Sequence, residues 1–226
     1  MASRSGRRAL LASAMIACAL SVAAPAYAQT PPVIDTTGGK TQPVFGYADA
    51  IRERVFIDSP YDSDHNGVND IIAIDIKRPK ATNEGLKAPV VMDPSPYYST
   101  LGRGNESQLK RDNDGDGLLD LWPLFYDNYF VPRGYAVILM DMIGTNNSTG
   151  CPTVHDVSDN LSAKVVIDWL NGRARGVDKN GTVVTAMRSI SGFPHARSMA
   201  TASSWPGSQS RMILVGMSSR LLPSAN

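Results

Sequence analysis

Cysteine is scarce in this 226-residue chain, which contains only Cys18 and Cys151. Cys18 lies in an N-terminal segment that we expect to be cleaved, so Cys151 would be the one cysteine of the mature protein. An internal disulfide scaffold is therefore excluded. Stability must come from a hydrophobic core, for which 42% hydrophobic and 19% charged residues are ordinary values, and the length suits one domain.

The chain also lacks a long, strongly hydrophobic run. Residues 9–24 are apolar but rich in alanine, follow a head with three arginines, and precede an Ala-Tyr-Ala cleavage signal at 26–28. This three-part pattern is typical of a signal peptide, whereas a membrane-spanning helix needs about 20 consecutive apolar residues. We therefore expect residues 1–28 to be a signal peptide and the mature protein to be secreted or periplasmic, without membrane attachment.

Neither sign of charge is in excess. The chain has 22 basic and 21 acidic residues, and loss of the three arginines of the signal peptide leaves 19 against 21, a net charge of −2. Nucleic-acid-binding domains carry a basic surplus. We therefore expect no nucleic-acid partner, and the sequence does not indicate an oligomeric state.

Acidic residues are absent from the last 40 positions. Residues 187–226 contain no Asp, Glu or Lys but ten serines and four arginines, and neither a strand period nor a helix period is sustained there. We interpret residues 187–226 as a tail foreign to the preceding fold, either disordered or translated out of frame.

The segment before this tail has the pattern of an α/β protein. Residues 53–58 and 70–77 are rich in β-branched residues and are joined by a turn-rich loop, which predicts a hairpin. Further strands are predicted at 88–92 and 135–140.

After the last of these strands, helical spacing begins at Asp156 and continues to residue 170. A strand followed by a helix favours a parallel sheet covered by helices. We expect residues 29–44 to be a linker or arm and residues 45–186 to form a partial α/β domain.

Two acidic loops share one spacing, DxDxNGxxD at 62–70 and DxDxDGxxD at 112–120. Carboxylates two residues apart on a tight glycine-containing loop can converge on a calcium ion, which prefers six to eight oxygen ligands. The alternative is a solvated turn in which the same side chains bond their own backbone. Neither loop has the twelfth-position acid of an EF-hand. The candidate ligands are Asp62, Asp64, Asn66, Asp70, Asp112, Asp114, Asp116 and Asp120.

A serine nucleophile with its histidine base is hard to find. The three histidines are His65 in an acidic turn, His155 beside the expected helix start, and His195 in the tail, and each is more typical of a surface residue than of a triad. Residues 216–220 approach the nucleophile motif GxSxG, but arginine replaces the last glycine and a helix cannot follow in the six remaining residues. Ser218 is therefore a poor nucleophile candidate.

Four separated blocks of sequence resemble one family. They read KTQPVFGYADAIRERVFIDSPYDSDHNGVNDIIAIDIKRPK, APVVMDPSPYYS, DNYFVPRGYAVILMDMIGTNNSTGCP and VIDWLNGRAR. Together, over residues 40–186, the chain resembles the secreted Xaa-Pro dipeptidyl-peptidases of the peptidase S15 family, which also includes acyl hydrolases of the cocaine esterase type.

The resemblance implies the N-terminal part of an α/β-hydrolase core, with a mostly parallel sheet and covering helices, incomplete after residue 186. It also implies that the strand at 88–92 lies between the strand at 135–140 and the strand that carries the nucleophile. Loss of the nucleophile strand would leave a central sheet edge unpaired, and such an edge invites aggregation.

The resemblance further implies release of N-terminal Xaa-Pro dipeptides through an acyl-enzyme, without a catalytic cofactor. Tyr97 matches the tyrosine whose hydroxyl joins the oxyanion hole, whereas the family's serine, aspartate and histidine have no counterpart before the tail. We therefore expect no peptidase activity from this chain alone. The alternatives are an acyl ester hydrolase and a non-enzymatic, exported calcium-binding fragment.

The change of composition after Ala186 suggests a shifted reading frame. Translation of the other two frames of the gene downstream of the codon for Ala186 should then yield a GxSxG turn followed by further hydrolase sequence. Resequencing of this stretch of DNA is the measurement, and the frameshift hypothesis fails if neither frame contains such a turn.

Overall fold

A computed structural model of the chain describes residues 30–99, 109–153 and 156–186 and the strand at 213–215. The expected signal peptide, His155, His195, Ser218 and most of the tail lie outside the described residues. Within the described part, no helix has the length and hydropathy needed to cross a membrane.

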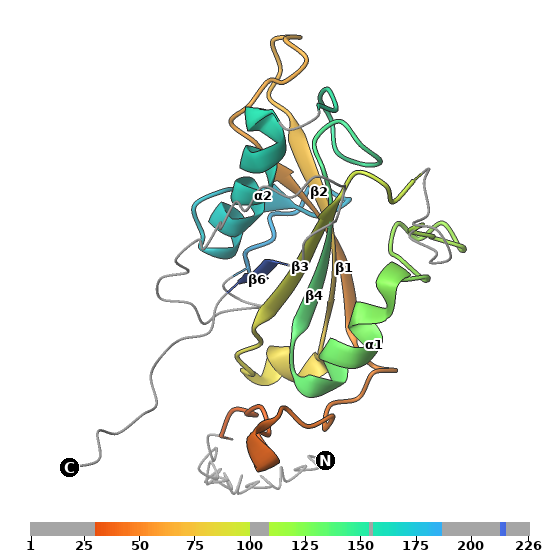
Figure 1. Cartoon of the computed structure of the whole chain (residues 1–226), viewed down its shortest axis with the longest axis vertical. Coiled ribbons are helices and arrows are strands. Elements are labelled where there is room, and N and C mark those ends of the chain that lie inside the picture. Colours follow the sequence, from red (N-terminus) through yellow and green to blue (C-terminus); the bar gives the residue numbers. More distant parts are fainter. Residues whose placement is uncertain (1–29, 100–108, 154–155, 187–212, 216–226) are drawn as a thin grey trace, which may run out of the picture. The chain divides into compact units, whose positions relative to one another are not determined.

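One mixed sheet organises the described residues (Figure 1). The order of its strands across the sheet is β5-β1-β2-β4-β3-β6. The strands are β1 (Ile51–Asp58), β2 (Ile71–Arg78), β3 (Val90–Ser95), β4 (Ala136–Asp141), β5 (Gly176–Val177) and β6 (Ile213–Val215). The four strands predicted from the sequence are all present, and β3 continues three residues beyond its predicted end at Met92.

The directions of the strands differ from the expected, mostly parallel sheet. β1 and β2 form the predicted antiparallel hairpin, with Ile51 opposite Arg78 and Asp58 opposite Ile71. β2 also runs antiparallel to β4, and β3 and β4 form the one parallel pair among the described strands. A short loop can join only antiparallel neighbours, whereas parallel neighbours need a longer crossover. The N-terminal hairpin therefore contributes an antiparallel part to the α/β fold.

Within the described residues, two α-helices and four short 3-10 turns accompany the sheet. The α-helices are α1 (Tyr126–Phe130) and α2 (Val157–Leu170), and the 3-10 turns are η1 (Thr37–Gly39), η2 (Lys80–Glu84), η3 (Pro123–Phe125) and η4 (Val131–Arg133). Asp156 caps α2, because its carboxylate accepts the N–H of Val157 at 2.6 Å.

The crossover that makes the parallel pair passes through α1, between β3 and β4. The predicted unit of strand, helix and parallel strand does not form around α2. Instead, α2 leads to β5, which pairs antiparallel with β1 at the other side of the sheet. The expected helix was therefore found, but not the strand direction that we inferred from it.

The alternation of side chains along the strands gives the sheet two different faces. Ile72, Ile74 and Ile76 of β2 lie in one apolar cluster with Trp169 of α2. The opposite face is covered by α1 and its neighbouring turns, where Val137, Leu139, Trp122 and Val131 form a second cluster. Figure 1 shows α1 and α2 on opposite sides of the sheet. The α1 face also contains buried charged residues, including Asp75 and Lys77 of β2.

The segment expected as a linker or arm lies against the turn that precedes β4. The N–H of Phe45 donates to the carbonyl of Pro132 at 2.9 Å. Gly134, with a φ of +90°, lies so close to this segment that a Cβ atom there would meet Ile34 at 2.7 Å and Phe45 at 2.9 Å. The absence of a side chain at Gly134 therefore permits the contact.

Substitution of Gly134 should reveal how much this contact contributes. Gly181→Ala is a matched control, because Gly181 also has a positive φ of +79° but no neighbour within 4 Å of a Cβ atom. The backbone cost alone should lower the free energy of unfolding by about 1 to 2 kcal/mol in Gly181→Ala. Gly134→Ala should lose about 1 to 3 kcal/mol more through overpacking. Urea denaturation measures both, and equal losses would contradict the described contact.

Candidate functional site

Tyr97 lies just beyond the carboxyl end of β3, which ends at Ser95. The parallel register places Ser95 opposite Asp141, the last residue of β4. In α/β sheets, ligands bind at the carboxyl ends of parallel strands. Tyr97 is half-buried there, and its N–H donates to the hydroxyl of Ser95 at 3.2 Å. The predicted oxyanion tyrosine therefore occupies the edge at which such a donor would be needed.

The next residue, Tyr98, is completely buried and anchors the turn. Its hydroxyl lies 3.0 Å from both the carbonyl and the carboxylate of Asp93, to which it donates. Its own carbonyl accepts the N–H of Lys110 at 3.0 Å. Burial, with the nearby carboxylate of Asp93, raises the pKa of the Tyr98 hydroxyl well above its usual value. Tyr98 therefore stays protonated and continues to donate.

A buried group of ion pairs lies beside this turn. The Lys110 ammonium contacts Asp75 at 2.8 Å and Asp141 at 2.7 Å, and Arg54 contacts Asp75 at 2.7 Å. The side chains of Lys110, Asp75 and Asp141 are each at most 2% exposed. Two positive groups thus balance two carboxylates, which is the condition for charges to be tolerated away from water.

Asp141 also fixes the loop that follows β4. Its second carboxylate oxygen accepts from the side-chain amides of Asn146 at 3.0 Å and Asn147 at 3.2 Å. The hydroxyl of Ser148 donates to the carbonyl of Asp141 at 2.7 Å and accepts the N–H of Ala73 at 2.8 Å. Asp141 therefore connects this loop to the same ionic group as Lys110.

A second buried ionic group lies at the other end of the sheet. The Lys77 ammonium contacts Asp127 at 3.0 Å and the hydroxyl of Tyr47 at 2.6 Å, and Tyr47 also donates to Asp127. Burial and the Asp127 carboxylate raise the pKa of Tyr47. Because Lys77 pairs with Val137 near the start of β4, this group is remote from Tyr97.

Sequence analysis missed both ionic groups. The signal that could have indicated them is the presence of Asp75 and Lys77 inside an otherwise apolar strand, two residues apart and hence on one face. Their partners come from distant segments, and no local pattern identifies those.

The described residues do not assemble a serine triad around Tyr97. The one described histidine, His65, belongs to the first acidic loop, where it adopts a positive φ of 58°. β6 pairs antiparallel with β3, and Val215 lies opposite Val90, the first residue of β3. β6 therefore ends at the edge opposite to Tyr97. A nucleophile strand has to run the other way, so that its carboxyl end reaches the oxyanion donor.

The pairing of β6 with β3 also concerns the edge of β3, which we expected to be unpaired. The resemblance implied that β3 would lie between β4 and the nucleophile strand. In the structure, β6 lies at the place expected for the nucleophile strand, next to β3. β6 pairs with only three residues of β3, Val90 to Met92, and its direction is reversed. The edge of β3 is therefore partly covered among the described residues.

The second acidic loop brings three of the candidate calcium ligands together. One carboxylate oxygen each from Asp112, Asp114 and Asp116 lies within 4.8 Å of the others. The fourth acid, Asp120, pairs with Arg52 at 2.7 Å and accepts the N–H of Asn113 at 2.8 Å. These contacts hold the pKa of Asp120 below its usual value, the N–H of Asn113 being the first cause.

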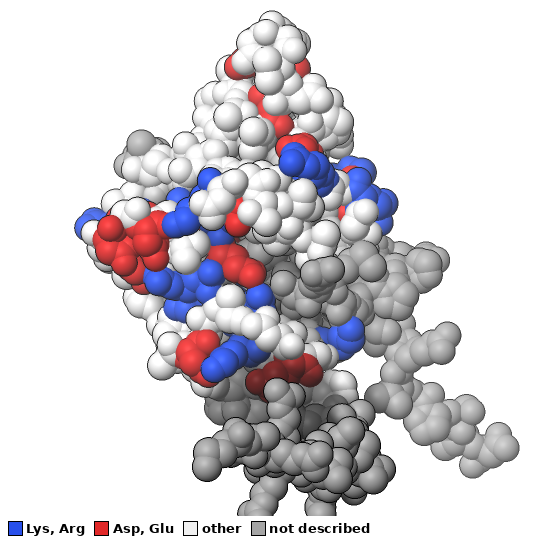
Figure 2. Space-filling model, turned by 180° about the vertical axis from the view of Figure 1, so that it is seen from behind, with Lys and Arg blue, Asp and Glu red and all other residues white. Residues whose placement is uncertain are grey.

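The first acidic loop uses its carboxylates as turn acceptors. Asp62 accepts the N–H of Gly67 at 2.9 Å, which lowers the pKa of Asp62, and buried Asp70 accepts the N–H of Ser63 at 2.8 Å. Asp64 and Asn66 hydrogen-bond to each other at 3.0 Å. The second loop forms equivalent turns, since Asp112 accepts the N–H of Gly117 at 2.8 Å. Acidic side chains gather beside basic ones on the face shown in Figure 2.

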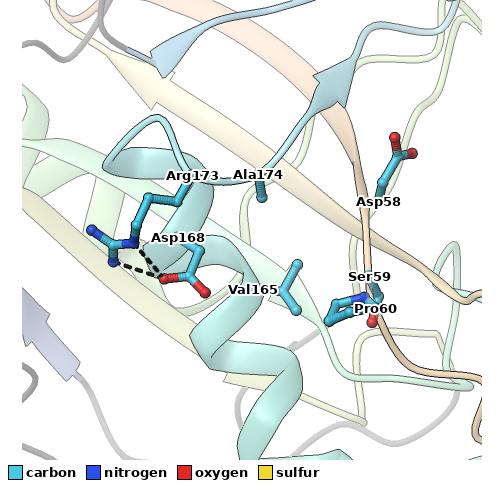
Figure 3. A pocket seen from close by; sticks show the side chains of 7 residues that line it. All are labelled: Asp58, Ser59, Pro60, Val165, Asp168, Arg173 and Ala174. Atoms are coloured by element: carbon cyan, nitrogen blue, oxygen red, sulfur yellow. Dashed lines mark hydrogen bonds and ion pairs between the residues drawn. The ribbon is translucent and has the colours of Figure 1, made fainter.

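A shallow cavity of about 270 Å³ lies between the end of β1 and α2 (Figure 3). It is lined by Asp58, Ser59, Pro60, Val165, Asp168, Arg173 and Ala174. Its charged groups are engaged in ion pairs, Asp168 with Arg173 at 2.7 Å and Asp58 with Arg175 at 3.0 Å. None of the predicted catalytic or metal-binding residues lines this cavity.

Comparison with known proteins identifies one family. A family model described as X-Pro dipeptidyl-peptidase (S15 family) matches residues 66–221. The match continues past Ala186, where we expected the resemblance to end, and includes the 216–220 sequence that contains Ser218.

Individual relatives agree with the family model. A protein of Streptomyces avermitilis named "Putative Xaa-Pro dipeptidyl-peptidase" is 47% identical over 180 residues, which cover 79% of this chain and 26% of that protein. The "Xaa-Pro dipeptidyl-peptidase" of Lacticaseibacillus rhamnosus is 30% identical over 172 residues, which cover 61% of this chain and 22% of that protein. The chain thus spans about a quarter of the length of these relatives.

Calcium binding by the second acidic loop is still a prediction, and calorimetry can test it. Calcium should release measurable heat with the wild-type chain, and Asp112→Asn combined with Asp114→Asn should abolish it, because two charged ligands are lost. Asp178→Asn is the matched control, since Asp178 is also an exposed turn acceptor, bound to the N–H of Thr182 at 2.8 Å. Absence of heat with the wild-type chain would leave the loop as a solvated turn.

Proposed function

The chain belongs to the X-Pro dipeptidyl-peptidase (S15) family, and we propose that it contains the oxyanion-binding part of a serine hydrolase that releases N-terminal Xaa-Pro dipeptides. The observation that carries this proposal is the position of Tyr97, at the carboxyl end of β3 on a turn that buried Tyr98 anchors. The names of the relatives support peptides as substrates.

The chemistry proposed for the family site is acyl transfer. A serine hydroxyl attacks the carbonyl carbon of proline, a histidine takes the serine proton and passes it to the departing amine, and an aspartate orients the histidine. The carbonyl oxygen becomes negative in the tetrahedral intermediate, and the hydroxyl of Tyr97 donates a hydrogen bond to it. Water then hydrolyses the acyl-enzyme and releases the dipeptide. Tyr97 is the only group of this constellation that we assign within the described residues.

We further propose that the 226-residue chain alone does not catalyse this reaction. Its one described histidine stands in an acidic loop, and β6 runs in the direction opposite to that of a nucleophile strand. Ser218 is the residue to test, because the family match includes it although its surroundings depart from GxSxG.

An acyl ester hydrolase of the cocaine esterase type is the second candidate. It would use the same oxyanion donor but a different acyl pocket, so Tyr97 does not discriminate between the two. Parallel kcat/KM measurements on the full-length Streptomyces avermitilis relative, with a Xaa-Pro amide and an aryl ester, separate them. A preference for the ester would reject the dipeptidyl-peptidase proposal in favour of this one.

A non-enzymatic, exported calcium-binding fragment is the third candidate. The observation that favours it is the approach of Asp112, Asp114 and Asp116 to within 4.8 Å, and the signal peptide expected at residues 1–28 accords with it. The calcium titration of the second acidic loop decides whether this candidate survives.

The purified 226-residue chain should show no turnover of alanyl-proline p-nitroanilide, because no attacking serine and base accompany Tyr97 among the described residues. Release of p-nitroaniline, followed by absorbance, is the measurement, and Ser218→Ala and Tyr97→Phe are the matched variants. Turnover that disappears in Ser218→Ala would overturn the proposal of an inactive chain and assign the nucleophile. A loss of about 100-fold or more in kcat in Tyr97→Phe would then confirm the oxyanion role.

A further inference from the structure

Tyr97 makes few hydrogen bonds with other described residues. It is half-buried, its N–H donates to Ser95, and no other described residue hydrogen-bonds to its hydroxyl. A hydroxyl that is to meet a developing oxyanion must be left available in this way, yet its position must be fixed in advance, because preorganised donors stabilise the transition state most. The rigidity of Tyr97 therefore has to come from its neighbours.

Tyr98 is the neighbour that is fixed, and Lys110 contacts it twice. The N–H of Lys110 donates to the carbonyl of Tyr98 at 3.0 Å, and the Lys110 ammonium lies 4.5 Å from the centre of the Tyr98 ring. An ammonium over a desolvated aromatic ring is attracted by the ring's electron density. Lys110 thus holds both the backbone and the ring of the residue that follows Tyr97.

The ammonium of Lys110 is itself held by the sheet. It has three polar partners, namely Asp75 on β2 at 2.8 Å, Asp141 at the end of β4 at 2.7 Å, and the carbonyl of Leu139 at 3.0 Å. It donates hydrogen bonds to Asp141 and to the carbonyl of Leu139, whereas its contact with Asp75 is an ion pair. A Lys110 that is 2% exposed and bound on three sides has little freedom to move.

We propose that Lys110 is a positioning residue for the oxyanion donor, and that it fixes the turn carrying Tyr97 to the carboxyl ends of the strands through Tyr98. This role rests on the proposed function of Tyr97. It assigns no contact between Lys110 and a substrate. The paired Asp141 and Asp75 serve the same purpose, because they hold the ammonium against the ring of Tyr98.

Fluorine NMR of the chain labelled with 3-fluorotyrosine can test this role without any turnover. The chain has eight tyrosines, and Tyr97→Phe identifies the resonance of Tyr97. In Lys110→Met the Tyr97 resonance should shift and broaden, whereas the resonance of Tyr135 on the remote side of β4 should not change. Lys110→Arg, which keeps the charge and the donors, should restore a sharp resonance close to the wild-type position.

Removal of Lys110 alone leaves buried carboxylates without their partner and could unfold the chain. The double variant Lys110→Met/Asp141→Asn avoids this, because it removes one charge of each sign and leaves the Arg54–Asp75 pair in place. Asp141→Asn alone is its reference, and circular dichroism confirms that both are folded. The Tyr97 resonance should be displaced in the double variant relative to Asp141→Asn.

Lys164→Met is the control for loss of a lysine, because Lys164 forms an exposed ion pair with Asp168 on α2. It should leave the Tyr97 resonance unchanged. An undisturbed Tyr97 resonance in the folded double variant would overturn the positioning role. That result would leave the proposed function standing, since the function is tested separately by turnover in the Streptomyces avermitilis relative.

Discussion

The carboxyl end of the sheet depends on the Lys110 ammonium and its buried carboxylates. Asp75 and Asp141 come from two neighbouring strands, and both are nearly inaccessible to water. Breaking one member of such a group costs about 3 to 5 kcal/mol, a large part of the roughly 5 to 15 kcal/mol by which a domain is stable. The geometry of Tyr98, the loop after β4 and the turn that carries Tyr97 all follow from the same ionic group.

The period-two alternation of the strands explains why this group is confined to one face. β2 directs Ile72, Ile74 and Ile76 towards α2, and the intervening Asp75 and Lys77 towards α1. The α2 face is therefore mainly hydrophobic and supplies most of the core, with the buried Arg78 paired to Glu53 at 2.7 Å near its end. The α1 face combines a smaller apolar cluster with ion pairs at both ends of the sheet, and one of these pairs lies beside the candidate site.

The sequence was sufficient to predict elements whose signals are local. The apolar run of β4, the β1–β2 hairpin and the helix α2 all appear where patterns of a few residues placed them. The direction of a strand in the sheet depends on distant segments of the chain. The antiparallel pairing of β5 with β1 and of β6 with β3 could therefore not be predicted from the residues of β5 and β6. The sequence did not predict that β3 continues through Pro94, because proline usually ends a strand. In the structure, β6 pairs with β3 only as far as Met92, two residues before Pro94. Tyr97 was selected by family resemblance, but its support by Lys110, thirteen residues further along the chain, depends on tertiary contacts.

Every side chain that anchors the turn of Tyr97 comes from one continuous stretch of the chain, between Arg54 and Asp141. In the proposed acyl-transfer centre, the donor to the carbonyl oxygen and its anchors are thus encoded together. A sequence change beyond Asp141 leaves all of these side chains unchanged, so it can alter the rest of the proposed site independently of them.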